Sequence, residues 1–140
     1  MIHVDTNILI EIVTLGSPMA KKLAEWLKTG EQLAASAIAW SEFLSGPVSE
    51  HQINGVKTVL ADQIVQFGVA EAATAAHLFN QIGRRRGARV DSFIAASAIL
   101  AGAPLLTKNL ADFRIFEPFS LHLQVSTQLR GKARLGRSFA

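Results

Sequence analysis

The sequence of 140 residues contains no cysteine. Disulfide bonds, thiolate chemistry and cysteine-ligated zinc or iron–sulfur sites are therefore excluded, and this usage fits a cytoplasmic protein. The sequence also lacks a phosphate-binding Walker loop, a GxGxxG motif and a serine nucleophile elbow. The histidines show no metal-ligand spacing: His3, His51, His77 and His122. Any catalytic chemistry is therefore expected from other residue types.

No signal peptide or membrane span is expected either. The N-terminus runs directly into Asp5, without a basic region followed by an apolar core. The stretch between Asp91 and Lys108 carries no charge, but Gly102 and Pro104 interrupt it, so it is a poor membrane span. We expect a cytoplasmic protein that does not bind membranes.

The charges are unevenly distributed along the chain. The net charge is +3, and residues 126–140 carry +4 and no acid, which leaves −1 for residues 1–125. The length suits one domain, which we place at residues 1–125, followed by a basic and mobile tail over residues 126–140. The basic residues of the domain gather immediately before Asp91: Arg84, Arg85, Arg86 and Arg89.

Strand and helix signals alternate along the domain. We expect strands at residues 2–4, 32–35, 64–67 and 104–107, and an edge strand at 121–123. We expect helices at residues 7–13, 18–29, 37–45, 50–61, 70–86 and 91–101, and a turn or short helix at 109–113. The alternation predicts an α/β protein, a three-layer α/β/α sandwich with a mainly parallel central sheet.

Three acids stand in unusual positions. Asp5 follows the first strand, and Asp91 opens the uncharged helix. Aspartate is a favoured N-cap residue, so helix capping is the structural alternative for both. Glu42 is the only charge in the apolar segment 37–45. An ionised glutamate there is costly unless it is paired, exposed or metal-bound, and a solvent-facing Glu42 is the alternative.

The strands of a parallel sheet end at one edge, where ligands bind. Asp5 follows one strand, and three polar residues follow the strand at 105–106: Thr107, Asn109 and Asp112. The economical interpretation gathers the acids in one cleft: Asp5, Glu42, Asp91 and Asp112. Clustered carboxylates repel one another unless protons or cations intervene, and oxygen ligands suit Mg²⁺ or Mn²⁺. Such a site favours phosphodiester hydrolysis.

The basic cluster has two interpretations. Arg84, Arg85, Arg86 and Arg89 precede Asp91, which places them to reach substrate phosphates near the cleft. Alternatively, cations at the end of a helix over residues 70–86 complement its dipole.

Four segments in this order resemble the PIN-domain nucleases: DTN at 5–7, SEFLSG at 41–46, DSFIAA at 91–96 and TKNLADF at 107–113. The size and ordering resemble a VapC-type toxin of a toxin–antitoxin pair, over residues 1–123. The resemblance implies a Mg²⁺-dependent endoribonuclease that is inhibited by a cognate antitoxin and forms a homodimer. By position, Asp5, Glu42 and Asp91 match the metal-site acids of the family.

The resemblance leaves the fourth acid open, because the family often has an acid where this chain has Asn109, and Asp112 follows three residues later. We assign catalysis to Asp5, Glu42, Asp91 and Asp112, and metal binding to the three aspartates among them. Orientation of water or substrate is assigned to Thr6, Asn7, Thr107 and Asn109.

Two other functions compete with this assignment. A phosphatase of the haloacid-dehalogenase type also has an aspartate after its first strand. The chemistry of that phosphatase requires a second aspartate two residues later, where this chain has Asn7. A non-catalytic PIN-like module that binds RNA or protein is the other alternative, because Asn109 stands at an acid position.

Overall fold

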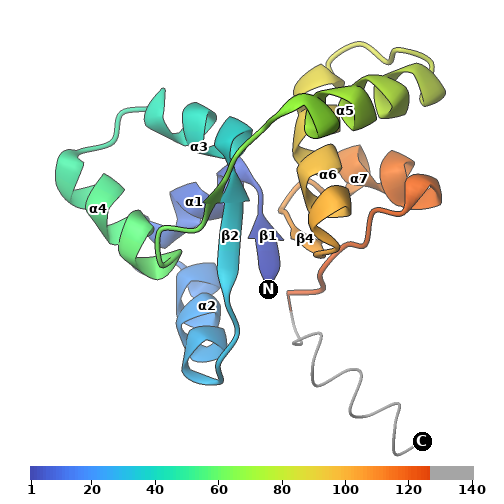
Figure 1. Ribbon diagram of the computed structural model, residues 1–140. Coiled ribbons are helices and arrows are strands. Elements are labelled where there is room, and N and C mark those ends of the chain that lie inside the picture. Colours follow the sequence, from blue (N-terminus) through green and yellow to red (C-terminus); the bar gives the residue numbers. More distant parts are fainter. Residues whose placement is uncertain (127–140) are drawn as a thin grey trace, which may run out of the picture.

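The protein, seen here in a computed structural model that describes residues 1–126, is built around a four-stranded parallel sheet with strand order β3-β2-β1-β4. Helices α1, α2 and α4 lie on one side of the sheet, and α5, α6 and α7 lie on the other (Figure 1). The predicted three-layer α/β/α sandwich is confirmed. The predicted basic tail lies outside the described residues from position 127 onward.

The strands are short, and each is followed by a helix. The strands are β1 (Ile2–Val4), β2 (Leu33–Ser36), β3 (Ile64–Val65) and β4 (Leu105–Leu106). The helices are α1 (Thr6–Ile12), α2 (Pro18–Lys28), α3 (Ala37–Leu44), α4 (Glu50–Val59), α5 (Val69–Gln81), α6 (Arg89–Ala101), α7 (Leu110–Phe113) and the 3-10 helix η1 (Arg114–Phe119). The edge strand expected at 121–123 is reduced to one parallel bridge between Leu105 and Leu123. Within residues 1–126, no helix has the length and apolar character needed to cross a bilayer.

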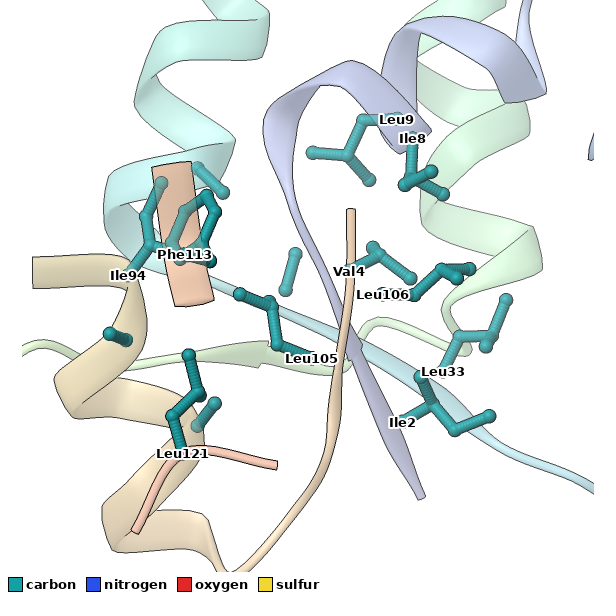
Figure 2. Packing of buried hydrophobic residues seen from close by; sticks show 14 of the residues in the cluster. Ile2, Val4, Ile8, Leu9, Leu33, Ile94, Leu105, Leu106, Phe113 and Leu121 are labelled. Atoms are coloured by element: carbon teal, nitrogen blue, oxygen red, sulfur yellow. The ribbon is translucent and has the colours of Figure 1, made fainter. Parts of the chain in front are cut away.

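The side chains of β1 and β4 alternate between the two faces of the sheet. Val4 and Leu106 point toward Ile8 and Leu9 of α1, whereas Leu105 points toward α6 and α7 (Figure 2). The residues that follow the strands continue this alternation. Asp5, with extended backbone angles, and Thr107 therefore come to the face that α6 and α7 cover.

Helix α6 is the central helix of this face. Its buried residues are Ser92 and Ile94 to Ala98, as expected for a helix without charges beyond its first turn. Three of them are alanines, which allow close approach of the helix to the sheet. Burial of one large apolar side chain is worth about 1.5–3 kcal/mol. Ile94 and Phe113, which lie on neighbouring elements in Figure 2, therefore anchor α6 and α7 to one another.

Serine side chains cap the starts of three helices. The Ser17 hydroxyl accepts from the Ala20 N–H, and the Ser36 hydroxyl accepts from the Ala39 N–H. A capping box of Ser49 and Gln52 starts α4. Ser36 ends β2 and starts α3 without an intervening loop, which holds α3 at the edge where the strands end.

The prediction that a helix over residues 70–86 ends in the arginine cluster is wrong. Helix α5 ends at Gln81, because Gly83, Arg84 and Gly87 adopt left-handed backbone angles (φ +76°, +55° and +83°) that stop the helix. The Arg84 N–H then donates to the Phe79 carbonyl. Arg84, Arg85 and Arg86 therefore lie in the turn between α5 and α6, and no basic residue lies in the last turn of α5 to complement its dipole.

Candidate metal centre

Asp5 is buried at the end of β1, with 5% of its surface exposed. One carboxylate oxygen accepts from the Thr6 N–H at 2.7 Å, so Asp5 is the N-cap of α1 as the structural alternative proposed. The other oxygen accepts from the Thr107 hydroxyl at 2.7 Å. Both oxygens are thereby held, and the carboxylate is fixed between β1 and the segment after β4.

The segment after β4 is tied to α1 by Asn7. The Asn7 carboxamide oxygen accepts from the Lys108 N–H at 3.2 Å, and its amide donates to the Thr107 hydroxyl at 3.5 Å. The Asn109 N–H also donates to that hydroxyl at 3.0 Å. Thr107 is therefore oriented by two donors while it donates to Asp5, and the four polar residues act as one network.

Glu42 lies on α3 with an exposed side chain, as the solvent-facing alternative required. It is nevertheless attached to the site, because its Oε1 accepts from the Thr6 hydroxyl at 2.6 Å. Thr6 thus links Glu42 on α3 to Asp5 through one residue of α1. The ionised Glu42 carboxylate carries little desolvation cost, because its side chain is exposed to water.

Asp91 is half-buried in the first turn of α6. The capping alternative is wrong for this residue, because the N-cap is Ala88 and makes no side-chain cap bond. Asp91 and Asp112 of α7 line one pocket of about 240 Å³. The other lining residues come from the arginine turn and η1: Arg85, Arg86, Gly87, Ala88 and Ile115.

The acids affect one another electrostatically. The pKa of Asp91 is raised from 3.8 to about 6, mainly by burial and in addition by the charges of Asp5, Asp112 and Glu42. Burial also raises the pKa of Asp5, and Glu42 and Asp112 add to the increase, while the hydrogen bonds from Thr107 and Thr6 oppose it. The structure therefore brings all four predicted acids within electrostatic reach of one another.

No basic side chain of the described residues forms an ion pair with these acids. The only ion pairs within residues 1–126 join the amino group of Met1 to Glu31 and Lys108 to Glu11, each at 3.5 Å. A concentration of carboxylates that form no ion pair is typical of a cation site.

The arrangement of the donors decides which cation fits. Within residues 1–126, no three acidic or histidine side chains enclose an ion by themselves. Zn²⁺, which takes three or four protein ligands, therefore does not fit. Mg²⁺ keeps several of its waters and needs only one or two carboxylates, so the pocket lined by Asp91 and Asp112 fits a hydrated Mg²⁺.

The four arginines of the basic cluster divide into two pairs. Arg85 and Arg86 line the pocket of Asp91 and Asp112. The Arg84 Nε donates to the Asn80 side chain at 3.0 Å. The Arg89 guanidinium lies 4.5 Å from the centre of the Phe79 ring. Only two of the four predicted phosphate ligands therefore face the acids.

The two candidates for the fourth position, Asp112 and Asn109, have different surroundings in the structure. Asp112 lines the pocket and raises the pKa of Asp5 and Asp91, whereas Asn109 does not line the pocket. Ile115, absent from the sequence-based site, lies three residues after Asp112. A spacing of three residues can place positions 112 and 115 on one face of a helix, and this spacing could have indicated Ile115. The sequence did not show where the helix after the turn begins.

Comparison with known proteins identifies the family of this chain. Residues 2–115 match the PIN domain, and the chain belongs to the PIN domain family. Ribonuclease VapC19 of Mycobacterium tuberculosis is 31% identical to this chain, over 81% of this chain and 92% of the relative. The resemblance to a VapC-type PIN domain is thereby confirmed.

Solved structures share the fold. FitAcB from Neisseria gonorrhoeae shares the fold with a TM-score of 0.68 and 20% identity, and the match covers 92% of this chain and all of that chain (100%). A toxin–antitoxin complex from Klebsiella pneumoniae matches with a TM-score of 0.63 and 28% identity, over 81% of this chain and 91% of that chain.

Proposed function

We propose that this protein is a metal-dependent endoribonuclease that hydrolyses RNA phosphodiesters and acts as the toxin of a toxin–antitoxin pair. The observation that carries the proposal is the group of mutually repelling acids, without a basic partner in residues 1–126, at the end of parallel strands. The similarity to Ribonuclease VapC19 supports the choice of RNA as substrate.

Each residue of the site receives a role in this proposal. Asp5, Asp91 and Asp112 hold Mg²⁺, or Mn²⁺ in its place, which supplies an acidified water and stabilises charge on the phosphoryl oxygens. Glu42, oriented by the Thr6 hydroxyl, takes up the proton of the attacking water. Thr107, Asn7 and Asn109 keep Asp5 in place through their hydrogen bonds.

The activity is tested with the purified chain and labelled single-stranded RNA. We expect internal cleavage in Mg²⁺ or Mn²⁺ and none in excess EDTA, because the carboxylates alone repel the phosphodiester. A small phosphomonoester and single-stranded DNA serve as control substrates. Hydrolysis of the phosphomonoester alone would favour the phosphatase, against which the PIN match speaks. RNA binding without cleavage would favour the non-catalytic module.

Arg85 and Arg86 are expected to bind substrate phosphates. Replacement of both by Gln should raise KM for RNA and reduce the slope of log affinity against log salt by about 1.4, since each phosphate contact to a single strand contributes about 0.7. Arg84→Gln is the matched control, because its guanidinium is bound to Asn80. An equal loss of salt dependence in the control would contradict the division of the cluster.

Asp112 is expected to outweigh Asn109 at the fourth position. Asp112→Asn removes a charge from the pocket and should raise the Mg²⁺ concentration for half-maximal cleavage by about 10-fold or more, in the range that lost supporting carboxylates cost. Asn109→Ala keeps the backbone N–H that donates to Thr107 and should change that concentration less. The reverse order of effects would make Asn109 the site residue.

A cognate antitoxin is the proposed protein partner. Apolar side chains are exposed on and after α1 and on α3: Ile10 (49%), Leu15 (100%) and Leu44 (42%). They offer a surface to an apolar segment of the antitoxin. The product of the neighbouring reading frame should bind the toxin and stop RNA cleavage. The homodimer implied by the resemblance, the cytoplasmic location and the division into a domain (1–125) and a tail (126–140) are also part of the proposal.

A further inference from the structure

Arg89, the first residue of α6, does not line the acid pocket and makes no ion pair within residues 1–126. Its guanidinium lies over the ring of Phe79 on α5, 4.5 Å from the ring centre. A cation in that position is attracted by the face of the aromatic ring. Arg89 therefore joins the start of α6 to the preceding helix.

The first turn of α6 has no side-chain cap, although the Ser92 hydroxyl donates to the Ala88 carbonyl at 2.8 Å. Its N-cap, Ala88, makes no side-chain cap bond, and Gly87 before it has a left-handed conformation with φ +83°. The first hydrogen bond of the helix runs from the Ser92 N–H to the Ala88 carbonyl at 2.9 Å. Asp91 lies in this turn. The position of the Asp91 carboxylate therefore depends on the contacts that hold this turn in place.

A force acts on this turn in the absence of a cation. Asp91 and Asp112 line one pocket, and two carboxylates that share a pocket repel each other. Repulsion would move Asp91 away from the other carboxylates if the turn were free to shift, and a wider spacing would weaken the binding of a shared cation. A contact that resists this displacement therefore helps to form the site.

We propose that Arg89, through its stacking on Phe79, is a positioning residue that fixes the first turn of α6 and keeps Asp91 at the metal site. Arg89 then serves the arrangement of the acids and does not bind substrate phosphate. The inference rests on the proposed function in one respect, namely that Asp91 binds the metal ion.

The test measures Mg²⁺ binding by titration calorimetry, independently of cleavage, with the full chain and its Arg89→Met, Phe79→Leu and double variants. Each single variant should raise the Kd for Mg²⁺ by about 2- to 5-fold, the range of a cation–π contact at an exposed site, because the Arg89 side chain is exposed. The double variant should be no weaker than the weaker single variant, because both remove the same contact. Arg89→Lys, which keeps the charge, should restore part of the affinity.

Hydrogen exchange of the metal-free proteins gives a second measurement. The Ser92 amide should exchange faster in Arg89→Met and Phe79→Leu than in the wild type. Phe67→Leu is the matched control, because Phe67 contacts Phe93 one turn further along α6 at 5.3 Å. This control should lower the melting temperature and leave the Kd for Mg²⁺ unchanged.

The outcomes separate this inference from the proposed function. A wild-type chain that binds no Mg²⁺ would overturn both. Mg²⁺ binding and RNA cleavage by the wild type, with an unchanged Kd in Arg89→Met and Phe79→Leu, would overturn the positioning role alone. A normal Kd together with a salt slope lowered by about 0.7 in Arg89→Met would make Arg89 a phosphate ligand instead. An equal rise of Kd in Phe67→Leu would also overturn the positioning role, because any loosening of the helix pair would then suffice.

Discussion

Asp91→Asn is expected to reduce Mg²⁺-dependent RNA cleavage by about 100-fold or more, since even carboxylates that only support metal ligands cost 10- to 100-fold when removed. The substitution keeps the shape of the side chain and removes its charge from the group of four acids. The loss should appear in kcat and in the Mg²⁺ concentration for half-maximal rate, measured with labelled RNA.

The same variant should fold at least as well as the wild type. Asp91 makes no cap bond and no ion pair within residues 1–126, so its replacement breaks neither kind of interaction and removes repulsion. Glu50→Gln on α4 is a control, because it removes an exposed carboxylate from a helix outside the site. Near-wild-type cleavage by Asp91→Asn would refute the assignment of this residue.

Much of this site was predictable from the sequence because parallel strands deliver their following residues to one edge. The placement of Asp5 and of the segment from Thr107 to Asp112 could be predicted once two strands were located. The apolar runs at 2–4 and 105–106 indicated those strands. The placement of Asp91 could be predicted from the start of the helix whose residues after Asp91 carry no charge. The order of these segments also carried the family resemblance.

The arginine cluster was not predictable in the same way. The alanine-rich pattern from residue 70 onward continues to favour a helix beyond Gln81, and a single glycine is tolerated within a helix. The left-handed residues at 83, 84 and 87 turn the chain there, and this turn decides which arginines face the acids. The contact between Arg89 and Phe79 joins two helices, so no local pattern in the sequence predicts it.

The acids should also make the stability of the metal-free protein depend on pH. The pKa of Asp91 is raised from 3.8 to about 6 in the folded state. The folded state therefore holds this proton more tightly than the unfolded state, so the associated stability is present below pH 3.8 and is lost as the pH rises through 6. The pKa of Asp5 is raised as well, which gives the same sign.

His3 changes stability in the opposite direction, because its burial in β1 lowers its pKa from 6.5 to about 4. The folded state therefore disfavours protonated His3, and stability is lost as the pH falls from 6.5 toward 4. The wild-type melting curve thus combines opposing contributions between pH 4 and pH 7. The difference between wild type and Asp91→Asn isolates the contribution of Asp91, because both proteins contain His3.

In EDTA, Asp91→Asn should therefore gain melting temperature relative to the wild type as the pH rises from 4 to 7.5. Mg²⁺ should reverse the order at pH 7.5, because a ligand of the folded state stabilises it by about 2.7 kcal/mol at 100 times its Kd, and the variant binds the ion weakly. Melting by circular dichroism over pH 4–8, with EDTA and with Mg²⁺, measures both effects. A constant difference across this pH range in EDTA would show that Asp91 is not under repulsion, and an equal response of both proteins to Mg²⁺ would place the ion elsewhere.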